Sequence, residues 1–148
     1  MPSQPDSVDS ALLAGIDSLL RVERLLERVP TPLTVPQYRI LRMVEAGGER
    51  AARLADRLAV RKPTLTAVAD GLVQAGFLVR ETEVLDRRVV RLCLTGRGAE
   101  ALQETERAYV ERVRPVIERA SDPARLLELL VELQDPAPSP ALPGTPVS

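Results

Sequence analysis

The segment from residue 51 to residue 98 changes its apolar periodicity, and this change limits the available folds more than any other feature of the chain. Small and aliphatic residues first recur at helical spacing, and apolar residues later alternate every second position, as in half-buried strands. The predicted elements are helices over 51–58 and 62–75 and strands over 79–82 and 90–94. Their order is helix, helix, strand, turn and strand, which is the order of a winged helix.

The two predicted helices carry small or aliphatic residues where a pair crossing at a steep angle needs them. Leu54 and Leu58 share one face of the first helix, and Ala55 leaves room for the second helix to approach. The inner face of the second helix is expected to consist of Leu65, Val68 and Leu72. This arrangement is typical of a helix-turn-helix, whose second helix enters the major groove of DNA. An ordinary helical hairpin with a solvated polar face is the alternative interpretation.

The outer face of the second helix is polar where it would meet a phosphate backbone. Lys62, Thr66, Asp70 and Gln74 are expected to project outward at helical spacing. Lys62, Thr64 and Thr66 fall in the first turns, where backbone N–H groups and the helix dipole attract phosphate. These positions are therefore candidate DNA contacts.

The turn of the hairpin carries an acidic residue and two basic residues in succession, Asp86, Arg87 and Arg88. A hairpin beside a recognition helix can reach over the phosphates into the minor groove, where a guanidinium meets concentrated negative potential. Asp86 is expected to hold a neighbouring arginine through a bidentate pair, which would stiffen the wing. An ordinary polar turn is the alternative interpretation of the triplet alone.

Basic charge is concentrated in the same region. The whole chain of 148 residues has a net charge of −1, which by itself predicts no nucleic-acid partner. Residues 61–97, however, hold seven basic and four acidic side chains and so carry a net charge of +3. This asymmetry favours a nucleic-acid interface in the middle of the chain.

Helices are also predicted on both sides of this region. A helix over 35–46 follows a proline-rich break, with Thr34 as its cap, Pro36 in its first turn and Gln37 at the capping-box position. Residues 8–29 and the region after Thr95 carry apolar stripes that are wide for solitary surface helices. Pro115 is expected to kink or divide the helix after Thr95.

Composition argues against an enzyme. The chain has no histidine and one cysteine, so no intramolecular disulfide, no His/Cys metal site and no histidine-based nucleophile is expected. No phosphate-binding glycine motif is found in the sequence, and no cofactor is predicted. The lone cysteine and the lack of a membrane-spanning apolar run predict a reducing, cytoplasmic location.

The chain resembles the MarR family of bacterial transcriptional regulators over roughly residues 8–133. The resemblance is carried by "LTVPQYRILRMV", by "LADRLAVRKPTLTAVADGLVQAGFLVR" and by "DRRVVRLCLTGRG". It implies a mainly α fold with a small β-hairpin, in which a winged helix-turn-helix is flanked by dimerisation helices. It implies one domain over 8–134, whereas residues 1–7, which lack apolar periodicity, and the proline-rich tail over 135–148 are expected to be disordered. Within the domain, residues 8–33 and 99–134 would form the dimerisation helices and residues 34–98 the DNA-binding part.

The resemblance also implies a homodimer that binds a pseudo-palindromic operator in double-stranded DNA, often as a repressor released by a phenolic or other lipophilic ligand. Carried over by position, the implied DNA contacts are Arg61, Lys62, Thr64, Thr66, Asp86, Arg87 and Arg88. Many relatives have a basic residue where this chain has Ala67, so its contact with a base would be apolar. A winged helix that binds another protein and no DNA is the alternative function.

Candidates for an effector pocket are Tyr38, Met43 and Tyr109, although an aromatic residue or methionine at helical spacing usually belongs to the core. Cys93 lies in a predicted wing strand, out of phase with its apolar neighbours, and is expected to be partly exposed. An incidental strand thiol is the favoured interpretation, since no nearby charge pattern predicts a lowered pKa.

Overall fold

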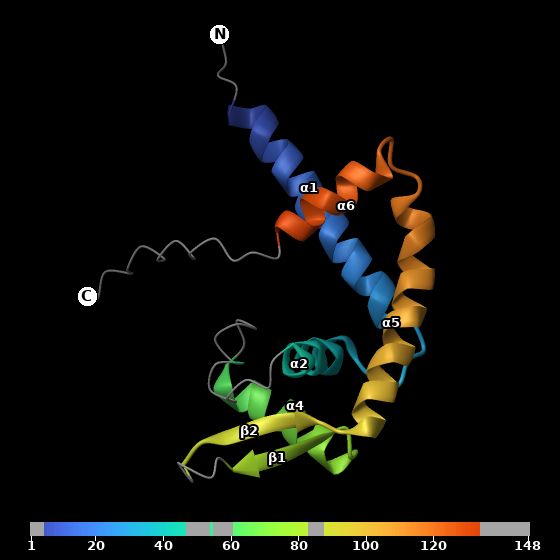
Figure 1. The fold of residues 1–148 in the computed structure, drawn as a ribbon. Helices are drawn as coiled ribbons and strands as arrows, with labels where there is room; N and C mark the ends of the chain where they lie inside the picture. The colour runs from blue at the N-terminus through green and yellow to red at the C-terminus, as the bar shows by residue number, and fades with distance from the viewer. Residues whose placement is uncertain (1–4, 47–53, 55–60, 83–87, 134–148) are drawn as a thin grey trace, which may run out of the picture. The chain divides into compact units, whose positions relative to one another are not determined.

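The computed structural model describes residues 5–46, 54, 61–82 and 88–133. The described chain is mainly helical and contains one two-stranded antiparallel hairpin (Figure 1). Its elements are α1 (Pro5–Glu27), α2 (Val35–Glu45), α4 (Lys62–Gln74), β1 (Leu78–Thr82), β2 (Val90–Leu94), α5 (Gly96–Ile117) and α6 (Pro123–Glu132). The predicted class, a mainly α winged helix with a small hairpin, is confirmed.

Two compact units divide the chain between Val113 and Arg114, inside α5. The first unit holds α1, α2, α4, the hairpin and most of α5, and the second holds the end of α5 and α6. Pro115 lies beside this boundary, but α5 continues through it to Ile117, so the proline does not divide the helix. Asp122 caps α6, because its carboxylate accepts a hydrogen bond from the Arg125 backbone N–H at 3.0 Å.

Helix α2 begins as its sequence predicts. The Thr34 hydroxyl accepts a hydrogen bond from the Gln37 backbone N–H, and the Gln37 side-chain oxygen accepts one from the Thr34 N–H. This reciprocal capping box satisfies two N–H groups that a helix start would leave unpaired. The inner face of α2 then buries Ile40, Leu41 and Val44 in the core.

Helix α4 ends in a glycine-dependent turn that leads directly into the hairpin. Gly76 has a φ of 77°, a left-handed conformation that residues with a Cβ adopt at a cost. The N–H of Gly76 donates to the carbonyl of Val73, and the N–H of Phe77 donates to that of Leu72, which together form a Schellman motif. The turn reverses the chain, so that β1 packs against α4.

The core of the first unit lies between α2, α4, α5 and one face of the hairpin. In the hairpin, Leu78 pairs with Leu94 and Arg80 with Leu92, so these four residues share a face. Leu78 and Leu92 are buried there, in an almost entirely aliphatic cluster. Its buried members are Leu33, Ile40, Leu41, Val44, Leu54, Leu65, Ala69, Leu72, Leu78, Leu92, Ala101 and Leu102.

The start of α5 is tied to the base of the hairpin by Thr95. The Thr95 hydroxyl donates to the Gly76 carbonyl at 2.7 Å and accepts from the Gly98 N–H at 2.9 Å, which makes Thr95 the cap of α5. The Thr95 N–H donates to the Phe77 carbonyl at 3.1 Å. A Cβ at Gly98 would collide with that carbonyl, so only glycine fits there without displacement.

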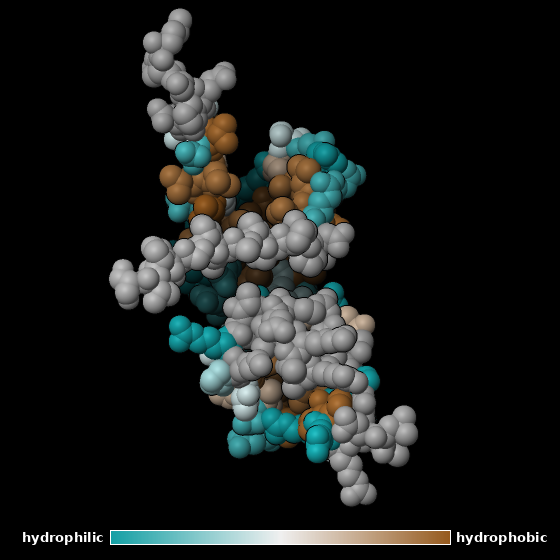
Figure 2. All heavy atoms as spheres, turned by 90° about the vertical axis from the view of Figure 1, so that its left-hand side faces the viewer, coloured by the Kyte–Doolittle hydropathy of each residue, from teal (hydrophilic) through white to brown (hydrophobic). Residues whose placement is uncertain are grey.

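Helix α1 begins at Pro5 and ends at Glu27, whereas the sequence predicts a helix over 8–29. From Val8 to Leu20 the helix exposes a continuous apolar stripe, part of which is visible in brown near the N-terminus (Figure 2). The residues of the stripe are 44–66% exposed and are Val8, Leu12, Leu13, Ile16, Leu19 and Leu20. In the second unit, α6 also exposes large apolar side chains, namely Leu127, Leu129 and Val131.

Of the predicted helix over 51–58, the structure describes Leu54, which is helical and fully buried as expected. The rest of that segment, the predicted disordered tail over 135–148 and the first four residues lie outside the described chain.

Candidate nucleic-acid interface

The orientation of α4 is set by its buried face. Leu65, Ala69 and Leu72 are buried in the core, and Val68 packs against it. Because 3.6 residues complete a turn, the opposite face carries Thr66, Asp70 and Gln74. Thr66 and Gln74 are exposed, in agreement with the sequence interpretation.

The predicted contacts at the start of α4 lie together on the first turns of this helix. Arg61 is the N-cap residue, with extended backbone and an exposed side chain, and it makes no side-chain cap hydrogen bond. Lys62 is the first helical residue, although its side chain lies outside the described part. Thr64 and Thr66 are exposed, and Ala67 is exposed beside them. This helix start can present backbone N–H groups to an anion.

The hairpin begins next to the C-terminal end of α4, and β1 contacts that helix (Figure 1). Arg88 precedes β2 and is exposed, as a wing residue that contacts DNA must be. Asp86 and Arg87 lie outside the described residues, so their predicted contacts and the bidentate pair of Asp86 stay predictions.

An ion pair joins the hairpin to α4. The guanidinium of Arg80 in β1 contacts the carboxylate of Asp70, which lies in the third turn of α4. Sequence reasoning placed Asp70 on the outer face but did not identify Arg80 as its partner. The signal was the strand alternation, which puts Arg80 on the same face as the buried Leu78 and hence toward α4.

Two tyrosines, one from α2 and one from α5, are in contact. The rings of Tyr38 and Tyr109 meet edge to face, with centroids 5.1 Å apart and planes at 73°. Burial raises the pKa of both phenols. A hydrogen bond with Arg42 lowers the pKa of Tyr38 and one with Thr31 lowers that of Tyr109, but both effects are smaller than that of burial. Arg42 also pairs with Glu45 at 3.0 Å and Glu106 at 3.2 Å.

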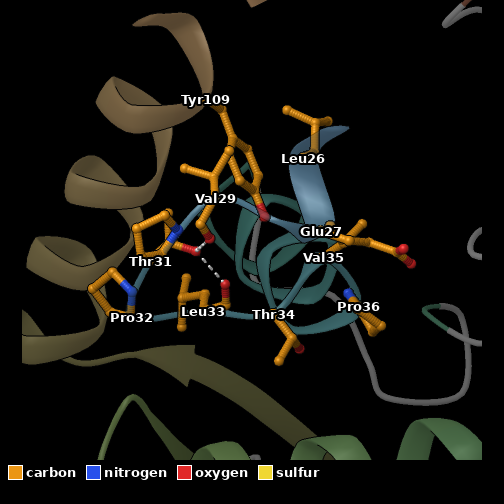
Figure 3. A pocket seen from close by; sticks show the side chains of 11 residues that line it. Leu26, Glu27, Val29, Thr31, Pro32, Leu33, Thr34, Val35, Pro36 and Tyr109 are labelled. Atoms are coloured by element: carbon orange, nitrogen blue, oxygen red, sulfur yellow. Dashed lines mark hydrogen bonds between the residues drawn. The ribbon is translucent and has the colours of Figure 1, made fainter. Parts of the chain in front are cut away.

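A cavity of about 400 Å³ lies beside Tyr109, between the end of α1 and the start of α2 (Figure 3). Polar and apolar groups share its lining about equally, and the hydroxyl groups come from Thr31, Thr34 and Tyr109. The Thr31 hydroxyl donates to the Leu33 carbonyl at 2.7 Å, and the ring of Tyr109 lies close to Thr31 in this view. The lining residues are Leu26, Glu27, Val29, Pro30, Thr31, Pro32, Leu33, Thr34, Val35, Pro36 and Tyr109.

The three predicted pocket residues occupy different places relative to this cavity. Tyr109 lines it, Tyr38 contacts the Tyr109 ring edge to face, and Met43 packs against the hydrophobic core. The sequence reasoning missed the linker between α1 and α2, which supplies most of the lining. A run containing three prolines predicts a break in the helix, but it does not predict that the break encloses a cavity.

Cys93 is partly exposed in β2, as its strand phase predicts. Burial raises the pKa of the Cys93 thiol, and the neighbouring Glu81 raises it further, whereas Arg91 lowers it. A thiol with a raised pKa forms thiolate less readily, which agrees with the interpretation of an incidental strand residue.

Within the described ranges, no group of three or more metal-ligating side chains is found. The same part of the chain contains no helix with the length and hydropathy needed to cross a membrane.

Comparison with known proteins identifies the family. The family model of MarR matches residues 33–90, which contain α2, α4, β1 and the first residue of β2. An uncharacterized HTH-type transcriptional regulator from Mycobacterium leprae is 30% identical over 142 residues, which cover 88% of this chain and 99% of that protein.

Two solved structures have the same fold. One is the transcriptional repressor CouR bound to a 23-mer DNA duplex, with a TM-score of 0.75 and 24% identity over 90% of this chain and 96% of that chain. The other is a mutant MarR from E. coli in complex with operator DNA, with a TM-score of 0.71 and 21% identity over 91% of this chain and 100% of that chain. The winged helix, the family match and the M. leprae relative lead to one conclusion: the chain belongs to the MarR family of transcriptional regulators.

Proposed function

We propose that this regulator is a homodimer that binds a pseudo-palindromic operator in double-stranded DNA. In this proposal it represses transcription until a small lipophilic or phenolic ligand releases it from the operator, and it is not an enzyme. The observation that carries the proposal is the exposed polar face of α4 next to an exposed, basic hairpin. The two parts together suit DNA, since a helix can fill one groove and a wing can reach the next.

In this proposal α4 enters the major groove. Thr64 and Thr66, with Arg61 and Lys62 before them, contact phosphates near the helix start, where the dipole favours negative charge. Ala67 offers a methyl group that can pack against the methyl of a thymine. Arg87 and Arg88 enter the adjacent minor groove, with Asp86 supporting one of them.

Dimerisation is supported by the apolar stripe of α1 and by the apolar residues of α6. A protein in solution rarely leaves so many large aliphatic side chains exposed on two helices without a partner. A second copy of the chain is the partner that we propose, because a two-fold pair presents two winged helices to one face of DNA. The operator half-sites would then lie about one helical turn apart.

The proposed ligand site is the cavity beside Tyr109. Its aliphatic and proline walls suit a small lipophilic molecule, and the hydroxyls of Thr31 and Tyr109 can bond to a phenol. Among the described residues that line it, Glu27 is the charged one, so a neutral phenol suits this lining better than a carboxylate. A thermal-shift titration comparing phenol with benzoate tests this choice, and stabilisation by benzoate alone would contradict it.

Fluorescence anisotropy with a labelled duplex from the region upstream of the gene tests DNA binding. We expect an affinity that falls steeply with salt, and Arg88→Ala is expected to weaken it several-fold. Arg42→Ala removes an exposed arginine of α2 and is the matched control. Salt-independent or absent binding of the wild-type protein would remove the proposal and favour a protein-binding winged helix.

A further inference from the structure

The apolar packing of β1 ends at its first residue. Leu78 is fully buried, whereas the four residues that follow it in the strand are exposed. From this point the outer part of β1 lacks the aliphatic contacts that fix its base. Beyond Leu78 the strand is held by its pairing with β2, whose Leu92 is buried in the core, and by polar contacts of its own with α4.

The ion pair between Asp70 and Arg80 lies at this point. Arg80 is two residues beyond Leu78 on the same strand face, and its guanidinium donates to the carboxylate of Asp70 on α4. The side chains are 48% and 42% exposed, so the contact lies at the surface and not in the core. A planar guanidinium fixes both distance and direction when it binds a carboxylate.

The position of Asp70 also matters for charge. Asp70 lies one turn beyond Thr66 on the outer face of α4, which the proposed function turns toward DNA. A carboxylate at that place repels phosphate unless a cation neutralises it. Arg80 supplies this cation from the wing.

We propose that Asp70 and Arg80 are a positioning pair, which holds the wing in a fixed orientation to the recognition helix and neutralises a carboxylate that would otherwise oppose DNA. The inference rests on the proposed DNA-binding function. It gives Arg80 a role that acts through Asp70 and not through a direct phosphate contact.

A double-mutant cycle measured by anisotropy separates these roles. Arg80→Gln is expected to weaken DNA binding about tenfold in the wild-type background, because it leaves Asp70 unpaired and the wing unheld. In the Asp70→Asn background the same substitution is expected to change affinity by about twofold or less. Arg42→Gln, which breaks the exposed ion pairs of Arg42 with Glu45 and Glu106, is the control and should leave affinity unchanged.

Thermal unfolding of each variant accompanies the cycle. An exposed ion pair contributes little to stability, so the unfolding midpoint should hardly move while affinity falls. A purely structural role would move both quantities together. If Arg80→Gln does not fold, Arg80→Lys gives the same cycle with a milder change, because lysine keeps the charge and loses the planar fork.

If Arg80→Gln lowers DNA affinity equally in both backgrounds, Arg80 contacts DNA itself. If it lowers affinity in neither, the ion pair has no role in DNA binding. Each result overturns the positioning role and leaves DNA binding intact. A wild-type protein that binds no duplex would instead overturn the proposed function, and the inference with it.

Discussion

Gly98 offers the sharpest test of the junction between the hairpin and α5. A methyl group on its Cα would collide with the carbonyl oxygen of Phe77 and lie 3.0 Å from Cδ1 of Leu94. Relief requires the start of α5 to move away from the hairpin, which strains the hydrogen bonds of Thr95 to Gly76 and Phe77. Gly98→Ala is therefore expected to destabilise the protein.

The magnitude follows from two contributions. Overpacking a closely fitted site costs about 1–3 kcal/mol, and weakening one hydrogen bond costs about 1 kcal/mol more. A total near 3 kcal/mol lowers the unfolding midpoint by about 10 °C in a chain of this size. Thermal unfolding followed by circular dichroism at fixed protein concentration measures the shift.

Gly96 is the matched control, because it lies two residues earlier in the same helix and a Cβ there meets no atom within 4 Å. Gly96→Ala should leave stability unchanged or raise it by at most about 1 kcal/mol through helix propensity. If the two variants unfold at the same temperature, the close approach of α5 to Phe77 is not what requires glycine at position 98.

Three further predictions test other parts of the chain. Thr34→Ala should lower the unfolding free energy by about 1 kcal/mol in denaturant titrations, because it removes the cap of α2, and an unchanged midpoint would contradict the capping role. Ile16→Glu should shift the protein to a monomer in size-exclusion chromatography with light scattering; a persistent dimer would show that the α1 stripe is not the interface. Because the pKa of Cys93 is raised, its alkylation by iodoacetamide at pH 8 should be slower than that of a free cysteine. The same raised pKa stabilises the folded protein at pH values below the pKa of the unfolded thiol, and this stabilisation should be lost as the pH rises through the pKa of the folded thiol. Alkylation at the rate of a free thiol would refute the expected slow reaction of Cys93.

Local signals predicted the helices well where the responsible residues are adjacent in sequence. Thr34 and Gln37 are three residues apart, so the cap of α2 could be predicted, and it is confirmed. The strand alternation likewise gave the hairpin, with β1 starting at Leu78, one residue earlier than expected.

Contacts between elements were harder to predict. Asp70 and Arg80 meet because a Schellman turn reverses the chain between them, and the direction of that reversal is not visible in their spacing. The cavity beside Tyr109 depends on how a proline-rich linker folds back on α5, which periodicity does not encode. Pro115 was expected to kink or divide α5, and it does not divide it, because the helix continues two residues beyond the proline. Its missing N–H removes one hydrogen bond, and so close to the end of the helix few further bonds depend on that turn.

The hydroxyl of Thr95 has a mechanical consequence. It binds the carbonyl that ends the turn after α4 and also the N–H that opens α5, while the Thr95 main chain continues from β2. The Thr95 hydroxyl therefore couples the first turn of α5 to the end of α4 and to the base of the hairpin. A rotation of the first turn of α5 is thus expected to move α4 and the base of the hairpin together.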